Sequence, residues 1–253
     1  MLNRVNSLTL ITESHNGPLD VALSHAILSA VSAGELGPTL RLHVPGALVA
    51  FGRADRVTPG YAAAVRAAEA HGFAPVERLA GGRAAVFHEA TIAFSLALPE
   101  AEPKTGIHER FEMISHLMVD AFDALGVDAR VGGIPGEYCP GKWSVNVGGR
   151  VKVMGVGQRL VRRAAHIGGV VVVDDGERIR DVLIPVYRAL GLDWDPRTAG
   201  ALADRAPGLT TDLVTKVILE QFRRRFPIVE RPLPDEVVTR ANDLLVEHLP
   251  QVA

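Results

Sequence analysis

A pair of glycines, Gly148-Gly149, separates two segments in which valine alternates with polar residues, from Trp143 to Val147 and from Arg150 to Met154. A two-residue glycine connection between alternating segments is typical of a β-hairpin. Such a turn would pair Val147 with Arg150, Val145 with Lys152 and Trp143 with Met154. The predicted pairing puts all six side chains on one face of the ribbon and surrounds Lys152 with apolar neighbours.

Apolar residues recur at helical spacing in several other segments. Helices are predicted from Leu19 to Ala30, from Thr58 as N-cap with Pro59 in the first turn to Ala70, from Phe111 to Leu125 before Gly126, from Asp181 to Leu190, from Asp212 to Arg225, and from Pro234 to His248.

Extended segments are predicted from Leu40 to Phe51, into Arg78, over Ala85 to Leu98 as one or two buried strands, and from Ile167 to Val173. This order of elements favours the α+β class, with a mostly antiparallel sheet and helices packed on it. Pro196 to Pro207 is the weakest candidate for a domain boundary. We expect residues 1–253 to form one domain with a short helical C-terminal segment.

The composition is that of a globular protein, with 253 residues, 47% hydrophobic and 22% charged. One cysteine excludes an internal disulfide framework and a cysteine-rich zinc site, and the remaining His, Asp and Glu lack metal-ligand spacing. No segment has the pattern of a leader peptide or of a membrane span. We therefore expect a soluble cytoplasmic protein with a free thiol and no metal.

The formal charge of −2 argues against a general nucleic-acid binder. Between Tyr138 and Val173, however, the sequence contains no acidic residue and six basic ones: Lys142, Arg150, Lys152, Arg159, Arg162 and Arg163. These side chains either form one face that attracts an acidic partner or are scattered over several solvated faces.

The single cysteine, Cys139, precedes Pro140-Gly141 and the predicted hairpin with Lys152. A thiolate nucleophile beside a lysine whose pKa is lowered by apolar surroundings is an arrangement suited to acyl transfer through a thioester. The alternatives are an inert buried cysteine and a lysine that extends to solvent at a sheet edge. A Cys-His pair would need a distant ring such as His88 or His166.

Gly81-Gly82 lies between Arg78 and Arg83. Two glycines allow backbone amides to approach a ligand, and an arginine can hold a carboxylate or phosphate. An ordinary turn between strands is the other interpretation.

Three segments together resemble the lipoate-protein ligase and octanoyltransferase superfamily, whose fold is shared with biotin-protein ligases. They are Arg78 to Glu89, similar to the family's Arg-x-x-Gly-Gly segment; Gly149 to Gln158, similar to its Gly-x-x-Lys-x-x-Gly-x-x-Gln hairpin; and Tyr138-Cys139-Pro140-Gly141, similar to the acyl-accepting segment of the cysteine-dependent octanoyl amidotransferase branch.

The resemblance implies a mixed central sheet flanked by helices and the transfer of an octanoyl or lipoyl group onto the lysine of a lipoyl domain. Cys139 and Lys152 would be the catalytic residues, and Arg78, Gly81, Gly82, Gly155 and Gln158 would bind substrate. The implied partners are acidic lipoyl domains of the glycine-cleavage H protein or a 2-oxoacid dehydrogenase E2, and acyl-carrier protein as a donor. No cofactor would be required.

The resemblance leaves alternatives open. An ATP-dependent lipoate-protein ligase would use ATP and Mg and form lipoyl-AMP, with Cys139 incidental. A non-enzymatic carrier-docking protein is a third interpretation, and biotin-protein ligase activity has only the fragment Gly52 to Arg56 in its favour. Glu89-Ala90-Thr91 replaces the ligases' Asp-x-Gly, so no catalytic role is assigned to His88.

Overall fold

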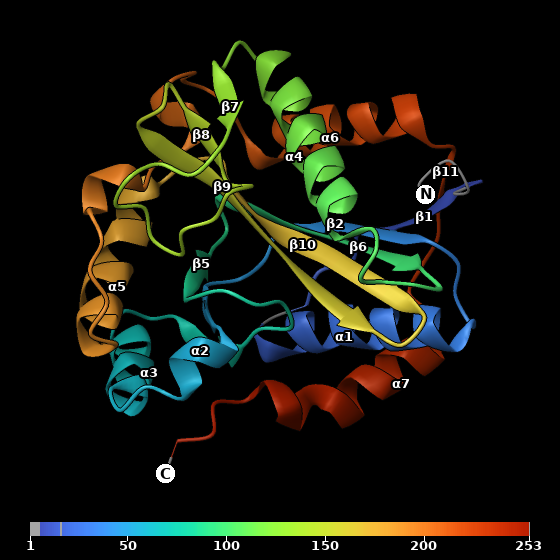
Figure 1. Cartoon of the computed structure of the whole chain (residues 1–253), viewed down its shortest axis with the longest axis horizontal. Helices are drawn as coiled ribbons and strands as arrows, with labels where there is room; N and C mark the ends of the chain where they lie inside the picture. Colours follow the sequence, from blue (N-terminus) through green and yellow to red (C-terminus); the bar gives the residue numbers. More distant parts are fainter. Residues whose placement is uncertain (1–5, 16, 253) are drawn as a thin grey trace.

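The structure is a computed structural model that describes residues 6–15 and 17–252. Eight strands form a large sheet in the order β11-β1-β2-β6-β10-β9-β8-β7 (Figure 1). Their bounds are β1 Leu8–Ile11, β2 Thr39–His43, β6 Thr91–Pro99, β7 Ala129–Val131, β8 Val145–Val147, β9 Val151–Val161, β10 Ala164–Val172 and β11 Ile228–Glu230. A smaller sheet has the order β4-β3-β5, with β3 Leu48–Phe51, β4 Ala74–Glu77 and β5 Ala85–Phe87.

The large sheet is mixed. Strand β1 pairs in parallel with β2 and β11, whereas the neighbouring pairs from β2 to β7 are antiparallel. Helices cover both faces, so the predicted class is confirmed: α+β with a mixed, mostly antiparallel central sheet flanked by helices.

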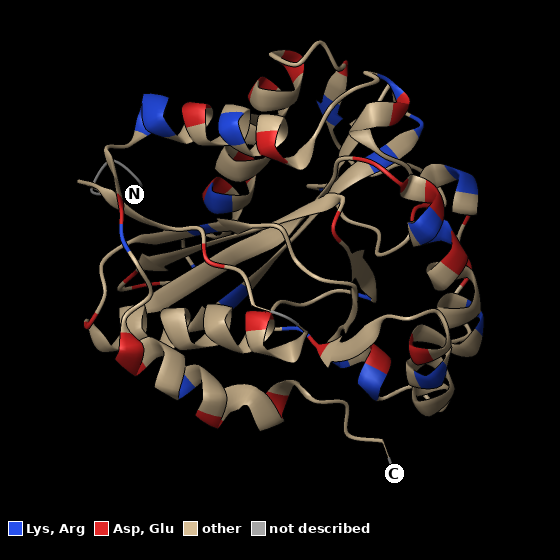
Figure 2. Cartoon of the chain, turned by 180° about the vertical axis from the view of Figure 1, so that it is seen from behind, with Lys and Arg blue, Asp and Glu red and all other residues tan. Residues whose placement is uncertain are grey.

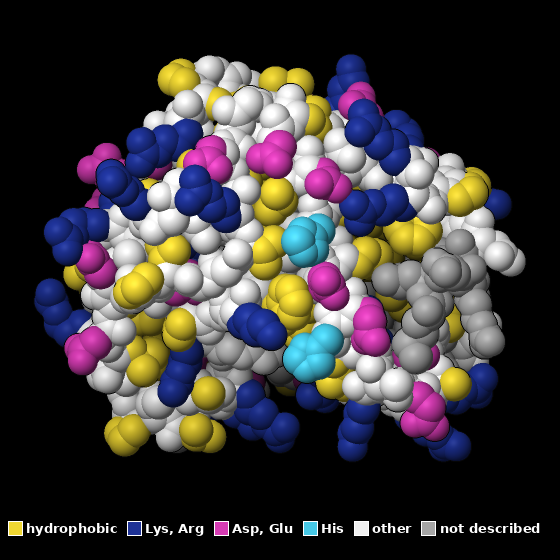
Figure 3. Space-filling view, turned by 45° about the horizontal axis from the view of Figure 1, so that its top comes forward, with side chains coloured by type: hydrophobic (Ala, Val, Ile, Leu, Met, Phe, Trp, Pro, Cys, Tyr) yellow, Lys and Arg dark blue, Asp and Glu magenta, His cyan; other side chains and the backbone are white. Residues whose placement is uncertain are grey.

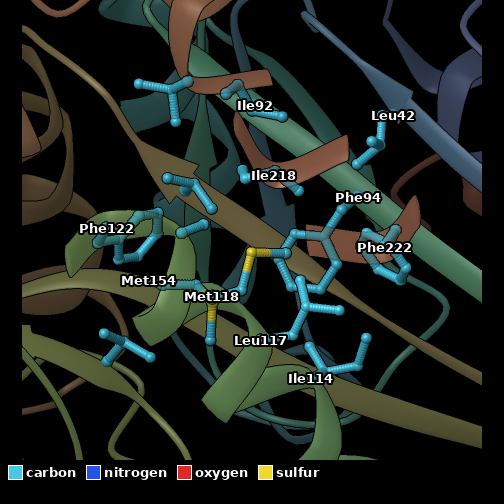
Figure 4. Close-up of a cluster of buried hydrophobic side chains, with 14 of the residues drawn as sticks. Leu42, Ile92, Phe94, Ile114, Leu117, Met118, Phe122, Met154, Ile218 and Phe222 are labelled. Carbon is cyan, nitrogen blue, oxygen red and sulfur yellow. The ribbon is translucent and has the colours of Figure 1, made fainter. Parts of the chain in front are cut away.

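One face of the large sheet carries the main hydrophobic core. Helices α4 (Ile107–Asp123) and α6 (Thr211–Arg225) pack on it, and the core residues alternate along the strands as expected for a sheet with one buried face. Figure 4 shows Met118 and Phe122 of α4 close to Met154 of β9, with Phe94 of β6 and Phe222 of α6 beside them.

The other face lies under α1 (Pro18–Ala33), the smaller sheet and the loop that follows β4. Helix α7 (Asp235–Leu244) and the 3₁₀ turn η4 (Leu245–His248) pack on the outside of α1. Helices α3 (Tyr61–Ala70) and α5 (Gly176–Ala189) pack against the smaller sheet, and short turns occur at α2 (Arg53–Arg56), η2 (Pro196–Thr198) and η3 (Leu202–Asp204). In Figure 2 the charged residues lie mainly on the outer helices and loops, and the central strands are almost uncoloured. No helix of the described ranges is long and apolar enough to cross a bilayer.

Most predicted elements are present with shifted ends, and one helix start needs correction. Thr58 is not the N-cap of α3, which begins at Tyr61. The Thr58 hydroxyl donates instead to the carbonyl of Asp55 at the end of α2. The segment from Ala85 to Leu98, predicted as one or two buried strands, forms two. They lie in different sheets, because the Thr91 hydroxyl and the backbone of His88 close a tight turn between them.

The predicted register of the hairpin is wrong by one residue. Lys152 pairs with Asn146 and Val151 pairs with Val147, since the connection contains Gly148, Gly149 and one further residue. A bulge at Val145/Asn146 then shifts the register again, so that Val145 pairs with Met154 rather than with the predicted Lys152. A one-residue slip changes the face of each side chain, so Lys152 does not lie among the predicted apolar partners.

The six basic residues between Tyr138 and Val173 do not form one face. Lys152 is buried, while Arg150 and Arg162 flank opposite ends of β9, separated by about 30 Å of strand. Figure 3 shows basic and acidic side chains interspersed over the face that it presents.

A buried ion pair between Arg41 of β2 and Asp20 fastens α1 to the large sheet. Arg41 also donates to the backbone carbonyls of Glu13 and Asp20. The replacement Asp20→Asn should lower the free energy of unfolding by about 3–5 kcal/mol, because it leaves a buried guanidinium without its counter-ion. Urea unfolding checks this. The control Asp120→Asn breaks an exposed pair with Arg225 and should cost less than about 1 kcal/mol; equal losses would contradict the prediction.

Candidate functional site

A cavity of about 380 Å³ opens beside β9, under the loop that follows β4. Cys139 and Lys152 both line it. So do all five predicted substrate-binding residues, Arg78, Gly81, Gly82, Gly155 and Gln158. The fold therefore brings the segment from Arg78 to Glu89 together with the segments of Cys139 and Lys152, which are near each other but far from it in the sequence.

Cys139 is held with its backbone in the left-handed region, at φ 41°. Its Sγ accepts hydrogen bonds from the backbone N–H of Arg83, at 3.2 Å, and from Nη2 of Arg78, at 3.4 Å. Its own N–H donates to the hydroxyl of Tyr187 at 2.8 Å, and that hydroxyl donates to the carbonyl of Ala84 at 3.0 Å. The loop around Cys139 and the loop around Gly81-Gly82, called the glycine loop below, are thus joined by hydrogen bonds on both sides of the sulfur.

The surroundings favour the thiolate of Cys139. Burial raises the pKa of this thiol, but the charges of Arg78 and Lys152 and the two hydrogen bonds to Sγ outweigh burial, so its pKa lies below that of an ordinary cysteine.

Lys152 is buried and all three of its N–H donors are engaged. Nζ donates to Oε1 of Glu137 at 3.1 Å, to the carbonyl of Tyr138 at 3.0 Å and to the carbonyl of Cys139 at 2.8 Å. Burial lowers the pKa of Lys152, and the charges of Cys139 and Glu137 oppose this effect. The ammonium therefore ties the nucleophile's loop to β9.

Glu137 is the buried anion of the site. Besides Lys152, its carboxylate accepts from the N–H of Ile134, the N–H of Gly141 and the hydroxyl of Ser144. Sequence reasoning missed Glu137 and Tyr187. Glu137 stands two positions before Cys139, in a stretch otherwise free of acids up to Val173, and that isolation was its signal; Tyr187 had none.

The glycine loop lies directly against the sulfur. A Cβ on Gly82, where φ is 108°, would stand 2.0 Å from Nη2 of Arg78 and 2.9 Å from Sγ of Cys139, whereas a Cβ on Gly81 would meet no atom within 4 Å. Gln158 contributes to the wall, and its amide is fixed between Arg110 and the carbonyl of Ile107.

His88 is buried outside this cavity, and its Nδ1 accepts from the N–H of Ala90. His166 lies in a neighbouring cavity. The described contacts of Sγ are to arginine groups, so the structure does not form a Cys-His pair at Cys139.

The chain belongs to the family described as the lipoyl protein ligase A/B catalytic domain, whose model matches residues 17–223. It is 30% identical over 209 residues to an octanoyl-[GcvH]:protein N-octanoyltransferase of Geobacillus kaustophilus, covering 81% of this chain and 73% of that protein. A protein of the same name from Oceanobacillus iheyensis is 25% identical over 229 residues, covering 86% and 81%.

A solved structure of lipoate-protein ligase A bound with ATP is similar in fold, with a TM-score of 0.75 at 17% identity, over 96% of this chain and 95% of that one. The predicted superfamily is thereby confirmed.

Removing the cation at the sulfur should raise the pKa of Cys139. In Arg78→Met, the pH midpoint of Cys139 alkylation by iodoacetamide should move upward, because the largest charge that favours the thiolate is lost. Alkylation is followed by intact mass from pH 5 to 10. Arg53→Met removes an exposed arginine and should leave the midpoint in place; an unmoved midpoint in Arg78→Met would contradict this assignment of the charge.

The two neighbouring glycines should respond differently to alanine. Gly82→Ala forces the new methyl group against Arg78 and Cys139 at a backbone conformation that alanine adopts poorly, so it should destabilise the protein by about 1–3 kcal/mol. Gly81→Ala meets no atom and should change the free energy of unfolding by less than about 1 kcal/mol. Urea unfolding of both variants measures the difference, and similar values would refute the close approach of the loop to the sulfur.

Proposed function

We propose that this protein transfers an octanoyl or lipoyl group through a thioester on Cys139 onto the lysine of a lipoyl domain. The single observation that carries the proposal is the common cavity of Cys139 and Lys152 beneath the glycine loop. Octanoyl-[GcvH]:protein N-octanoyltransferases are the relatives that support this activity, and a lipoyl-[GcvH]:protein N-lipoyltransferase of Listeria monocytogenes, 23% identical, supports the lipoyl alternative.

In the first step the Cys139 thiolate attacks the carbonyl carbon of the acyl donor, which is a thioester on acyl-carrier protein or a lysine amide on an acylated H protein. A new carbon–sulfur bond forms and the bond from the carbonyl carbon to the donor sulfur or nitrogen breaks. The donor takes up a proton and leaves as a thiol or as a lysine amine. In the second step the acceptor lysine, as a neutral amine, attacks the acyl-cysteine. An amide forms, the amine loses a proton, and the Cys139 thiolate is regenerated.

Arg78, the N–H of Arg83 and Lys152 supply positive charge and N–H donors around the reacting sulfur. In our proposal they stabilise the thiolate before attack and after release, and the amide of Arg83 is the nearest candidate for an oxyanion-hole donor. Because its three donors are engaged, Lys152 acts chiefly by its charge and by fixing the Cys139 carbonyl.

The proposed acceptors are the glycine-cleavage H protein and the lipoyl domain of a 2-oxoacid dehydrogenase E2, with acyl-carrier protein or an acylated H protein as donor. This reaction needs neither ATP nor Mg, since the acyl group is already bonded to its donor and is exchanged onto Cys139 rather than activated from a free acid. We place the reaction in the cytoplasm, where a lone thiol stays reduced. Residues 1–253 would act as one catalytic domain.

The test is to incubate purified protein with octanoyl-acyl-carrier protein, or with octanoyl-H protein, without ATP. The intact mass should gain one octanoyl group, and an unacylated lipoyl domain should then become octanoylated on lysine. Cys139→Ala should abolish both, and Lys152→Met should slow transfer about 100-fold or more because a charge at the reacting sulfur is lost.

Lys216→Met, at an exposed position of α6, is the matched control and should transfer at the unmodified rate. If Cys139→Ala still attaches lipoate to the lipoyl domain with Mg-ATP, the protein is a ligase and the proposal fails.

A further inference from the structure

A second cavity of about 100 Å³ lies next to the first, and we call it the inner cavity because its lining includes residues of β6 and β10, the two middle strands of the large sheet. The two share four lining residues, Arg78, Phe87, Gly168 and Gly169. The walls of the inner cavity are mostly apolar, yet two histidines, His43 and His166, also line it.

Both cavities have the same face of the large sheet as their floor. Gly157 of β9 pairs with Gly168 of β10, which pairs with Ser95 of β6, and Ser95 pairs with Arg41 of β2. Residues paired across strands share a face, as do residues two positions apart. His43 and His166, each two positions from a member of this row, therefore project from the same face as Gly155 in the first cavity.

The glycines keep this floor low between the two cavities. A Cβ on Gly168 would stand 2.8 Å from Cε1 of His166 and 2.7 Å from the carbonyl of Phe94, so a side chain there would collide with both. The absence of a side chain at Gly168 therefore leaves room for the His166 imidazole beside a residue that lines both cavities.

The imidazoles of His43 and His166 are buried, with 8% and 5% of their surface exposed. Among the described residues, neither ring nitrogen of His166 has a hydrogen-bond partner, and neither does Nδ1 of His43. Nε2 of His43 is 3.5 Å from Oδ1 of Asp20. Burial lowers the pKa of His166 to about 4 and that of His43 well below its ordinary value, so each ring is neutral near pH 7 and carries one N–H donor and one acceptor.

The sheet geometry places the two histidines on the far side of the first cavity. His43 lies on β2, three strand spacings or about 14 Å from β9. The backbone of His166 lies four residues or about 13 Å along β10 from Val170, the partner of Gly155, and its ring lies nearer, over Gly168. An extended octanoyl chain has seven carbon–carbon bonds and spans roughly 9 Å. Measured along the sheet from Gly155, a tail longer than octanoyl therefore extends further toward His43 and His166.

We propose that His43 and His166 form a polar stop in the inner cavity, which disfavours hydrocarbon tails long enough to reach it and accepts a tail that ends in a hydrogen-bonding group. The inference rests on the proposed acyl transfer through Cys139 and adds its substrate selectivity. Contact with a methyl end leaves the ring nitrogens permanently without partners, which is the costly way to bury a polar group. A terminal hydroxyl of the same length supplies both a donor and an acceptor.

The test compares three acyl chains presented as thioesters of the same carrier protein: octanoyl, decanoyl and 9-hydroxynonanoyl. The last two are matched in length, because the hydroxyl oxygen of 9-hydroxynonanoyl takes the place of the terminal carbon of decanoyl. Equimolar pairs compete for Cys139, and intact mass gives the adduct ratio at early times. Octanoyl should exceed decanoyl, and 9-hydroxynonanoyl should exceed decanoyl at least about fivefold, the lower limit for an unpaired buried polar group.

Two variants then remove the polar atoms separately. His166→Leu and His43→Leu should each reduce the 9-hydroxynonanoyl to decanoyl ratio at least about fivefold by raising decanoyl loading. His116→Leu, at an exposed position of α4, should keep the ratio of the unmodified protein. Urea unfolding verifies that each variant is folded, and the unmodified protein alone already tests the inference if one of them is not.

Equal rejection of decanoyl and 9-hydroxynonanoyl would mean a purely steric limit and overturn the inference, as would equal loading of octanoyl and decanoyl or ratios unchanged in both histidine variants. In each of these outcomes Cys139 is still acylated, so the proposed function stands. Failure of all three chains to load, both from the carrier protein and from the correspondingly acylated H protein, would instead overturn the proposed function and the inference with it.

Discussion

The site depends on one buried ammonium. Nζ of Lys152 holds the Glu137 carboxylate and the carbonyls of Tyr138 and Cys139, so a side chain from the middle of the sheet fixes three consecutive residues of an otherwise irregular loop. Removing such a charge from water is costly unless its partners are well placed. Glu137 supplies the counter-charge and is itself held by two backbone amides and a hydroxyl. The left-handed backbone of Cys139 is maintained by this network together with Tyr187.

The same arrangement places opposing requirements on the sulfur. Burial alone would keep the thiol protonated, and only the cations and the N–H of Arg83 reverse this. The absence of a side chain at Gly82 allows Arg78 to approach the sulfur, because any side chain there would occupy the space between them. Close approach of backbone to sulfur and a lowered pKa are therefore two results of one packing arrangement.

Much of this organisation could be predicted from the sequence. Periodicity located α1, α4 and α6, and the three motif segments predicted a common cavity that the structure forms. The setting of Lys152 could not be predicted correctly. Strand register depends on a bulge at Val145/Asn146 and on a third residue in the connection, and neither has a sequence signal at this length. The polar lining of the inner cavity could not be predicted from the sequence either. His43 and His166 line the same cavity only because β2, β6 and β10 pair side by side.

The order of strands in the large sheet has a consequence for how the molecule is made. Strand β1 is flanked by β2 and by β11, and Glu13 just after β1 accepts a hydrogen bond from the N–H of Leu233, 220 positions later. Helix α7 likewise covers α1. During synthesis from the N-terminus, β1 has one unpaired edge and α1 has an uncovered surface until β11 and α7 have left the ribosome. We therefore expect the nascent chain to be most prone to aggregation in that interval, and we expect chaperones to bind the exposed strand edge and helix surface.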